Sequence, residues 1–159
     1  MKLLILAVVM IVLTLGCSGS KAKIPEAGDQ LPTATLDQTE KLFKLITDIR
    51  DEYGTAFNQA NFPDDDTKQV AKDWFKGKEL YYEIIRIQYL GLTRSRKAQS
   101  VADLLALTAG FVEVPEAVFT KWEFKSGESG KQKFTKLSRL ETLRDDYYVM
   151  AIALAREVK

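Results

Sequence analysis

Residues 36–61 read LDQTEKLFKLITDIRDEYGTAFNQAN, and their apolar side chains recur every three or four residues. This spacing places the apolar side chains on one face of a helix. Thr35 and Gln38 have the spacing of a capping box, in which each side chain bonds a free backbone amide at the helix start. A helix with one apolar face needs a packing partner for it. The apolar positions of this helix are Leu42, Leu45, Ile46, Ile49, Tyr53 and Phe57.

A second helix is expected after Pro63 and runs to about Leu92. Three aspartates, residues 64–66, open it, because carboxylates favour the positive end of a helix dipole. They lack the alternating spacing and the glycine of a calcium-binding EF-hand loop, so we interpret them as helix caps. Gly77 and Gly91 each cost about 1 kcal/mol inside a helix, which suggests that a neighbouring backbone approaches closely there. The expected apolar stripe is Val70, Trp74, Leu80, Tyr81, Ile84, Ile85 and Ile87.

A third helix is expected from Ser100, with Asp103 as its capping partner. Pro115 interrupts this helix, because the residue before a proline is disfavoured in the helical region. We expect the break at residues 113–114 and a helical continuation to about Lys125.

The fourth helix is expected over residues 131–157, after a turn rich in serine and glycine. Four amphipathic helices with short connections predict an all-α, up-down-up-down four-helix bundle, with its third helix broken near Pro115. This bundle domain covers residues 36–159. Residues 17–35 carry glycine and proline without apolar periodicity, which predicts a flexible linker in front of the bundle.

The first residues form a separate segment, in which Lys2 precedes an apolar run from Leu3 to Leu15. The run is shorter than the roughly 20 residues that a membrane-spanning helix needs, so we interpret it as a signal peptide. Residues 1–17 resemble the signal peptide and lipobox of bacterial lipoprotein precursors. Gly16 and Cys17 fit that pattern, whereas Thr14 and Leu15 depart from its commonest residues.

The resemblance implies that residues 1–16 are removed and that Cys17 is lipidated, which anchors the protein to a membrane without spanning it. Ser18 follows the cysteine where an aspartate is the usual signal for retention in the inner membrane. The resemblance therefore implies the outer membrane in a Gram-negative host, on its periplasmic or surface face. The alternative is an unmodified thiol at the end of an ordinary signal peptide or an uncleaved anchor.

Composition excludes several function classes. The chain has no histidine and one cysteine, which excludes Ser-His-Asp triads, Cys-His nucleophiles and an internal disulfide. Without histidine, the acidic residues of the fourth helix do not match the carboxylate–histidine metal sites of helical bundles. The 23 basic and 22 acidic residues nearly balance, which does not favour nucleic-acid binding. We therefore expect no cofactor, no metal and no enzymatic activity, although Ser-Lys or carboxylate chemistry stays open.

Arg94, Arg96 and Lys97 form a cationic connection between the second and third helices. In an up-down bundle this connection lies at the same end as the linker, where cations attract anionic lipid headgroups by about 1 kcal/mol each. The alternative is a simple electrostatic role, in which the cations stabilise the end of the second helix.

Two aromatic groups are further candidates for ligand or partner contacts. Two tyrosine pairs are expected at similar heights on parallel helices, where the break in the third helix opens a side pocket; the alternative is a packed core. A basic and aromatic cluster surrounds the last turn, at the opposite end from the linker, and it suits an anionic partner; the alternative is solvated lysines around a turn whose aromatic rings lie in the core. The first group is Tyr81, Tyr82, Tyr147 and Tyr148 with Arg144, and the second contains Trp122, Lys125, Lys131 and Lys133.

These features together predict a lipid-anchored protein of the bacterial cell envelope that acts by binding, with another envelope protein as its expected partner. The alternative is a lipoprotein that binds a small ligand or an envelope polymer, through the tyrosine pocket or the distal basic cluster.

Overall fold

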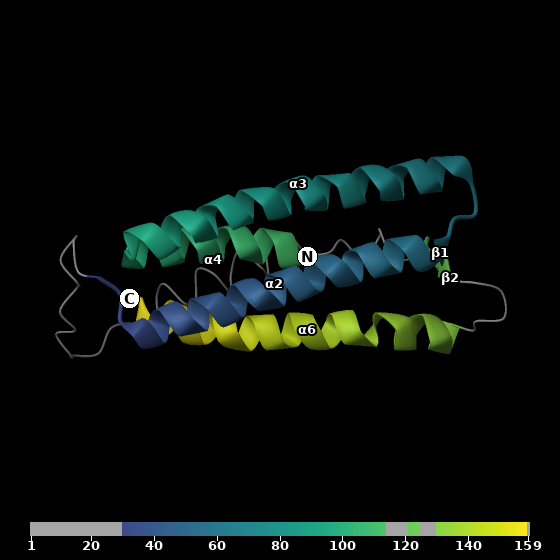
Figure 1. Cartoon of the computed structure of the whole chain (residues 1–159). Coiled ribbons are helices and arrows are strands. Elements are labelled where there is room, and N and C mark those ends of the chain that lie inside the picture. The colour runs from purple at the N-terminus through teal and green to yellow at the C-terminus, as the bar shows by residue number, and fades with distance from the viewer. Residues whose placement is uncertain (1–29, 114–120, 125–129, 159) are drawn as a thin grey trace, which may run out of the picture.

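The computed structural model describes residues 30–113, 121–124 and 130–158, and of residues 124 and 130–138 it describes only the backbone. Four long helices pack side by side in this part of the chain, which confirms the all-α four-helix bundle (Figure 1). The predictions for the signal peptide, for Cys17 and for Pro115 lie outside the described residues.

The described helices are α2 (Thr33–Gln59), α3 (Asp65–Ser95), α4 (Ala98–Val112) and α6 (Gly130–Glu157). Helix α2 packs against the other three, most extensively against α6, while α3 packs mainly against α4 (Figure 1). Helix α4 has 15 residues and is much shorter than its neighbours. The main core lies between the four helices.

Helix α2 buries the face that the sequence predicts, since Leu42, Ile46, Ile49 and Tyr53 are fully buried. The predicted capping box at its start is wrong. The residue before the helix is Pro32, which provides no side-chain cap.

Thr35 and Gln38 instead reach across to the last residue of α6. The Thr35 hydroxyl donates to Glu157 Oε2 at 3.0 Å, and Gln38 Nε2 donates to Glu157 Oε1 at 2.7 Å. The carboxylate accepts both bonds, so the first turn of α2 is tied to the last turn of α6.

Helix α3 begins as the sequence predicts. Asp64 is its N-cap, and its Oδ1 accepts a hydrogen bond from the backbone amide of Thr67 at 2.6 Å. This bond holds the pKa of the Asp64 carboxyl below its usual value. The capping interpretation of this aspartate is therefore confirmed.

The apolar stripe predicted for α3 is largely wrong. Val70, Leu80, Ile84 and Ile87 are 52 to 66% exposed, although Ile85 is fully buried. The face that packs on the bundle advances by three and four residues and contains a lysine, which made it the less apolar choice in the sequence. Its buried residues are Ala71, Lys78, Tyr82, Ile85 and Leu92.

Helix α4 ends at Val112 and Glu113 is extended, so the predicted break is confirmed. The predicted helical continuation to Lys125 is wrong at residues 123–124. These form strand β2 (Glu123–Phe124), which pairs antiparallel with β1 (Ala60–Asn61) at the end of α2. The short pairing returns the chain to the bundle before α6.

The predicted cap of α4 is also wrong, because the helix begins at Ala98 and its N-cap position is Lys97. The Ser100 hydroxyl instead lies 3.0 Å from the Ser95 hydroxyl at the end of α3. This hydrogen bond links the two sides of the α3–α4 turn.

Candidate functional site

The chain enters the bundle at the α3–α4 turn. The backbone amide of Leu31 donates to the carbonyl of Arg96 at 2.9 Å, and Gln30 pairs with Lys97 in an isolated antiparallel bridge. Residues 33–35 are already helical and residues 30–31 contact the bundle, so the described bundle starts before the expected helix start at residue 36. We call residues 30–31 and 96–97 the entry clasp.

The cationic connection lies at this entry clasp, as predicted from the up-down topology. Arg94, Arg96 and Lys97 are all exposed. Arg96 adopts the left-handed conformation (φ 50°), and its amide closes α3 by donating to the carbonyl of Leu92 at 2.8 Å. The structure thus brings three exposed cations to the point where the predicted linker joins the bundle.

In each tyrosine pair one ring is buried and the other is not. Tyr82 and Tyr147 are buried, and their hydroxyls lie 3.0 Å from the Thr47 hydroxyl and 2.9 Å from the Thr108 hydroxyl, respectively. Tyr148 is 42% exposed. Burial raises the pKa of Tyr147 to about 12. Tyr82 and Tyr147 therefore serve as packed core residues with satisfied hydroxyls.

Tyr81 fills the space beside Gly110 of α4. A Cβ at Gly110 would lie 2.7 Å from the Tyr81 hydroxyl, so only glycine leaves room for the ring at this place. The Tyr81 hydroxyl also lies near enough to Tyr147 to raise the pKa of that phenol. The structure thus brings together one tyrosine from each of the two pairs.

Lys78 is the central polar residue of the bundle, and the sequence analysis missed it. Its ammonium group donates to the carbonyls of Phe111 at 2.5 Å, Glu113 at 2.8 Å and Gly110 at 3.3 Å. These carbonyls lie at the end of α4, where no further helical turn supplies donors. Lys78 therefore caps α4 from the neighbouring helix.

Aromatic rings surround the same ammonium group. Lys78 Nζ lies 5.7 Å from the ring centres of Tyr53 and Trp74 and 5.3 Å from that of Phe111, distances typical of cation–π contacts. Burial lowers the pKa of Lys78 from its usual 10.5 to about 8; the nearby carboxylate of Glu113 opposes this shift, and the positive charge of Arg144 contributes to it. The spacing of Lys78 from Ala71 and Tyr82 is the signal that could have placed it on the buried face.

A hollow of about 480 Å³ lies beside Lys78, close to the predicted side pocket. It is bordered by apolar rings and, at the end of α4, by the exposed Glu113. Arg144 lies outside this lining, and its Nε is buried without a hydrogen-bond partner among the described residues. The hollow is lined by Trp74, Gly77, Lys78, Tyr81, Gly110 and Glu113.

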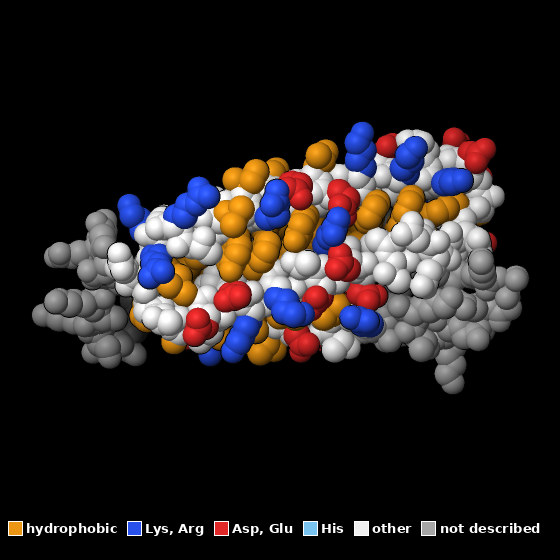
Figure 2. All heavy atoms as spheres, viewed as in Figure 1, with side chains coloured by type: hydrophobic (Ala, Val, Ile, Leu, Met, Phe, Trp, Pro, Cys, Tyr) orange, Lys and Arg blue, Asp and Glu red, His pale blue; other side chains and the backbone are white. Residues whose placement is uncertain are grey.

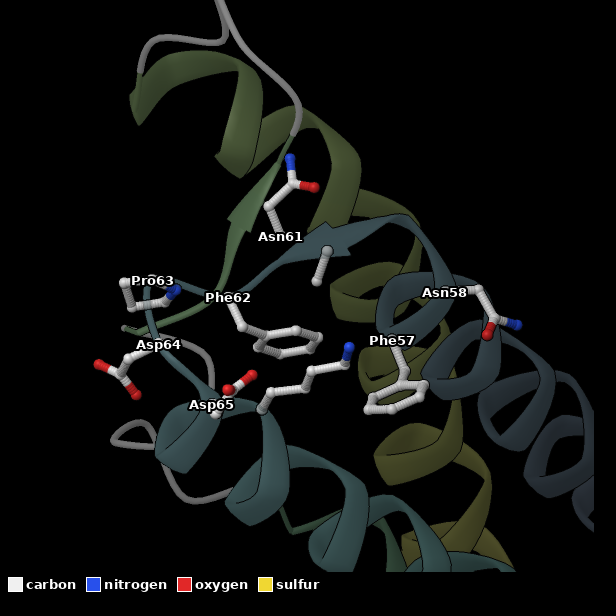
Figure 3. A pocket seen from close by; sticks show the side chains of 9 residues that line it. Phe57, Asn58, Asn61, Phe62, Pro63, Asp64 and Asp65 are labelled. Atoms are coloured by element: carbon white, nitrogen blue, oxygen red, sulfur yellow. The ribbon is translucent and has the colours of Figure 1, made fainter.

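A second hollow, of about 660 Å³, lies at the end of the bundle opposite the entry clasp, where the chain passes from α2 to α3. Figure 3 shows the Phe57 and Phe62 rings at its wall, while the Asp64 carboxylate points away from them. The ring centres of these phenylalanines are 5.7 Å apart. The hollow is therefore an open surface depression over packed aromatic rings.

Trp122 is buried and not available to a partner, which agrees with the alternative for the distal cluster, in which its aromatic rings lie in the core. It is 1% exposed and packs edge-on against the rings of Phe57, Phe62 and Trp74. The reason is that β2 pairs with β1 at the end of α2, which places Trp122 against the aromatic rings there. The side chains of Lys125, Lys131 and Lys133 lie outside the described residues.

The exposed apolar residues of α3 form a surface that we call the outer stripe: Leu80, Ile84 and Ile87, with Gly77 and Gly91 at its ends. A Cβ at either glycine would meet nothing within 4 Å, so the predicted close backbone approach is wrong for the contacts described within this chain. Figure 2 shows apolar side chains standing along the outer edge of α3. Val70 and Leu90 of the same helix are also exposed, at 65 and 43%.

Within the described ranges, no three Asp, Glu or Cys side chains gather as metal ligands. None of the helices described is both long and apolar enough to cross a membrane. The comparisons with known proteins found no matching family model, no matching curated protein and no matching solved structure.

Proposed function

We propose that the protein is a lipid-anchored component of a bacterial cell envelope that acts by binding other proteins rather than by catalysis. The observation that carries the proposal is the entry clasp, which joins the predicted lipidated linker to the bundle beside Arg94, Arg96 and Lys97. The sequence supplies the anchor, because Cys17 ends an apolar run too short to span a bilayer.

The linker length fits this arrangement. The chain from Cys17 to Leu31 reaches at most about 46 Å when fully extended. Each exposed cation near an anionic headgroup layer adds about 1 kcal/mol of attraction. Lipid insertion and the cations of the entry clasp would then hold the same end of the bundle toward the membrane.

The polar residues of the bundle favour binding over catalysis. Lys78 is the described side chain best suited to chemistry, because its pKa is lowered to about 8. However, its ammonium group already serves three carbonyl acceptors at the end of α4. That arrangement gives Lys78 a structural role, whereas the residues that the structure describes leave the outer stripe of α3 uncovered.

The anchor is tested with Cys17→Ala in the full chain expressed in a bacterial host. We expect the wild-type protein in the membrane fraction, with a mature N-terminus at an acylated Cys17 by mass spectrometry. We expect Cys17→Ala to lose the acyl chains and to leave the membrane fraction. Ser18→Ala is the matched control and should behave as wild type. An unmodified thiol, or equal membrane association of Cys17→Ala, would contradict the anchor.

A second candidate function is the binding of a small ligand or an envelope polymer in the hollow beside Lys78. Its aromatic lining, with Trp74 and Tyr81 at the rim, is the observation that favours it. Thermal shifts by envelope polysaccharide fragments that Tyr81→Ala abolishes would support this function, provided that Tyr148→Ala keeps the shifts. The absence of any shift would exclude those fragments.

A further inference from the structure

We propose that the outer stripe of α3 pairs with the outer stripe of a second copy of this chain, with the two helices antiparallel. This inference goes beyond the proposed function, because α3 would pair in the same way whether or not Cys17 carries lipid. It rests on three observations: the exposure of the stripe, its heptad spacing and the charges at its ends.

The exposure is unusual for residues of this size. Leu80, Ile84 and Ile87 are 62, 52 and 66% exposed, although the same helix buries Ile85 completely. Single exposed apolar residues are common, but an ordered row of them on a helix marks an interaction surface. Burying these side chains against a second copy removes this apolar area from water.

The spacing of the stripe is that of a coiled-coil seam. From residue 70 to residue 94 the seam positions advance alternately by three and four residues. On its other side, α3 uses a second set of positions with the same spacing to pack on its own bundle. The helix therefore has two seams, of which the described residues of the chain cover one. The outer seam consists of Val70, Asp73, Gly77, Leu80, Ile84, Ile87, Gly91 and Arg94.

In an antiparallel pair of α3 helices centred near residue 82, two large side chains meet at the centre, and a large side chain meets a glycine on either side of it. Leu80 then faces Ile84 of the second copy, and Ile87 faces Gly77 of the second copy. A large side chain opposite a glycine lets two helices approach closely without a clash. This pairing gives a use to Gly77, which has open space around it in the single chain and costs about 1 kcal/mol in a helix interior.

The charges favour the same orientation. Asp73 and Arg94 are exposed seam residues near opposite ends of the stripe. In the antiparallel pair each Asp73 lies about 4.5 Å along the axis from Arg94 of the second copy, within reach of the long arginine side chain. In a parallel pair Asp73 would instead face Asp73 of the second copy, and Arg94 would face Arg94, so like charges would repel. Charge complementarity therefore selects the antiparallel dimer.

Both copies can still reach one membrane in this dimer. The pair forms a rod in which the two entry clasps lie at opposite ends. The linker from Cys17 to Leu31 extends to about 46 Å, so the two anchors can insert in the same bilayer while the rod lies along it. Arg96 and Lys97 lie beyond the seam and remain available to headgroups.

The test is the number of chains per particle, measured by light scattering with a detergent correction on the full chain purified in detergent. We expect two chains for the wild type. Ile84→Glu places a charge in the seam centre and should weaken association at least about tenfold. Val149→Glu is the matched control, since Val149 is 72% exposed on α6 and lies off the seam, and it should leave the dimer intact. Circular dichroism checks that both variants stay helical, and Leu80→Glu replaces Ile84→Glu if the latter unfolds.

The orientation is tested by exchanging the end charges. Asp73→Arg and Arg94→Asp alone should each weaken the dimer several-fold, and the double variant should restore it, because opposite charges then face each other again. A single chain per particle in the wild type would overturn the proposal. Equal dissociation by Val149→Glu would also overturn it. The proposal would also be overturned if the double variant did not regain the dimer.

Discussion

Lys78 lies on the buried face of α3 and completes the end of a different helix. Three backbone carbonyls that α4 leaves without donors accept from its ammonium group, while three aromatic rings enclose the charge. The last carbonyls of a helix need donors from outside it, and at the end of α4 Lys78 supplies them together with the Tyr53 hydroxyl, which lies 3.3 Å from the carbonyls of Phe111 and Val112. The end of α4 and the buried lysine are thus structurally coupled, because Lys78 stabilises the helix end.

Lys78→Met should lower the free energy of unfolding by about 2–4 kcal/mol, because the carbonyls of Gly110 and Glu113 lose the ammonium donor and that of Phe111 keeps only the Tyr53 hydroxyl, while the apolar volume is kept. Denaturant unfolding followed by circular dichroism measures the loss. Lys76→Met is the control, since Lys76 is exposed on the same helix and should change stability by less than about 0.5 kcal/mol. Equal effects of the two variants would show that the carbonyl contacts contribute nothing.

The same residue predicts how stability depends on pH. The pKa of Lys78 is about 8 in the folded protein and 10.5 when it is unperturbed, so the unfolded chain binds more protons between these values. The free energy of unfolding should therefore rise as the pH increases from 8 towards 10. Denaturation midpoints measured across this range test the rise, which Lys78→Met should remove.

Two buried tyrosines act in the opposite direction at higher pH. Burial raises the pKa values of Tyr53 and Tyr147, the latter to about 12, so above pH 10 the unfolded chain loses phenol protons that the folded protein keeps. Stability should then fall with increasing pH, which gives a maximum near pH 10. Tyr147→Phe should flatten the falling side of the curve and leave the rising side unchanged.

At the scale of the element, the buried face of α2 could be predicted from the sequence, whereas the buried face of α3 could not. Every strongly apolar position of α2 lies on one face, so periodicity alone identifies its core. Helix α3 carries two apolar faces, and the sequence pattern favours the one with Leu80, Ile84 and Ile87 because the other contains Lys78. Only the three-dimensional contacts of Lys78 with α4 reveal that its face is the buried one.

The tyrosine pairs and the cationic turn were predictable for a different reason. Their positions follow from helix length and up-down topology, which depend little on side-chain detail. By contrast, the strand pair and the buried place of Trp122 depend on how residues 121–124 return to the bundle. Composition and periodicity carry no information on that return, so they did not decide whether Trp122 contacts a partner or lies in the core.

Alanine substitutions at Gly91 and Gly110 should change the stability of the bundle in opposite directions. Gly91→Ala should raise the free energy of unfolding by about 0.5–1 kcal/mol, because its Cβ meets open space and alanine favours the helix. Gly110→Ala should instead lower it by about 1 kcal/mol, because the new Cβ would lie 2.7 Å from the Tyr81 hydroxyl and displace the ring. Thermal unfolding of the two variants side by side measures the difference in sign. A gain in both would mean that Tyr81 moves aside freely.

At the scale of the whole molecule, the bundle has a main core and a smaller distal one. The distal core consists of Ala56, Ala71 and Trp122, surrounded by partly buried aromatic rings. It joins α2 and α3 to the strand pair that precedes α6. Trp122 contributes to this core from an extended segment rather than from a helix.

Trp122→Ala should lower the free energy of unfolding by about 3–5 kcal/mol, because it removes the largest fully buried side chain and leaves a cavity between α2 and α3. Urea unfolding followed by circular dichroism measures this loss. Trp122→Phe keeps an apolar ring in the same place and should lose markedly less. If Trp122→Ala were as stable as wild type, the distal core would not support the bundle.

The entry clasp also determines how the bundle bears mechanical load. A pull on a membrane-held linker reaches the domain at Leu31, whose amide is bonded to the α3–α4 turn, and then passes to the first turn of α2, which Glu157 joins to α6. Tension is therefore shared among all four helices at one end of the rod. In the proposed anchored protein, this arrangement would keep a pull on the linker from detaching one helix at a time.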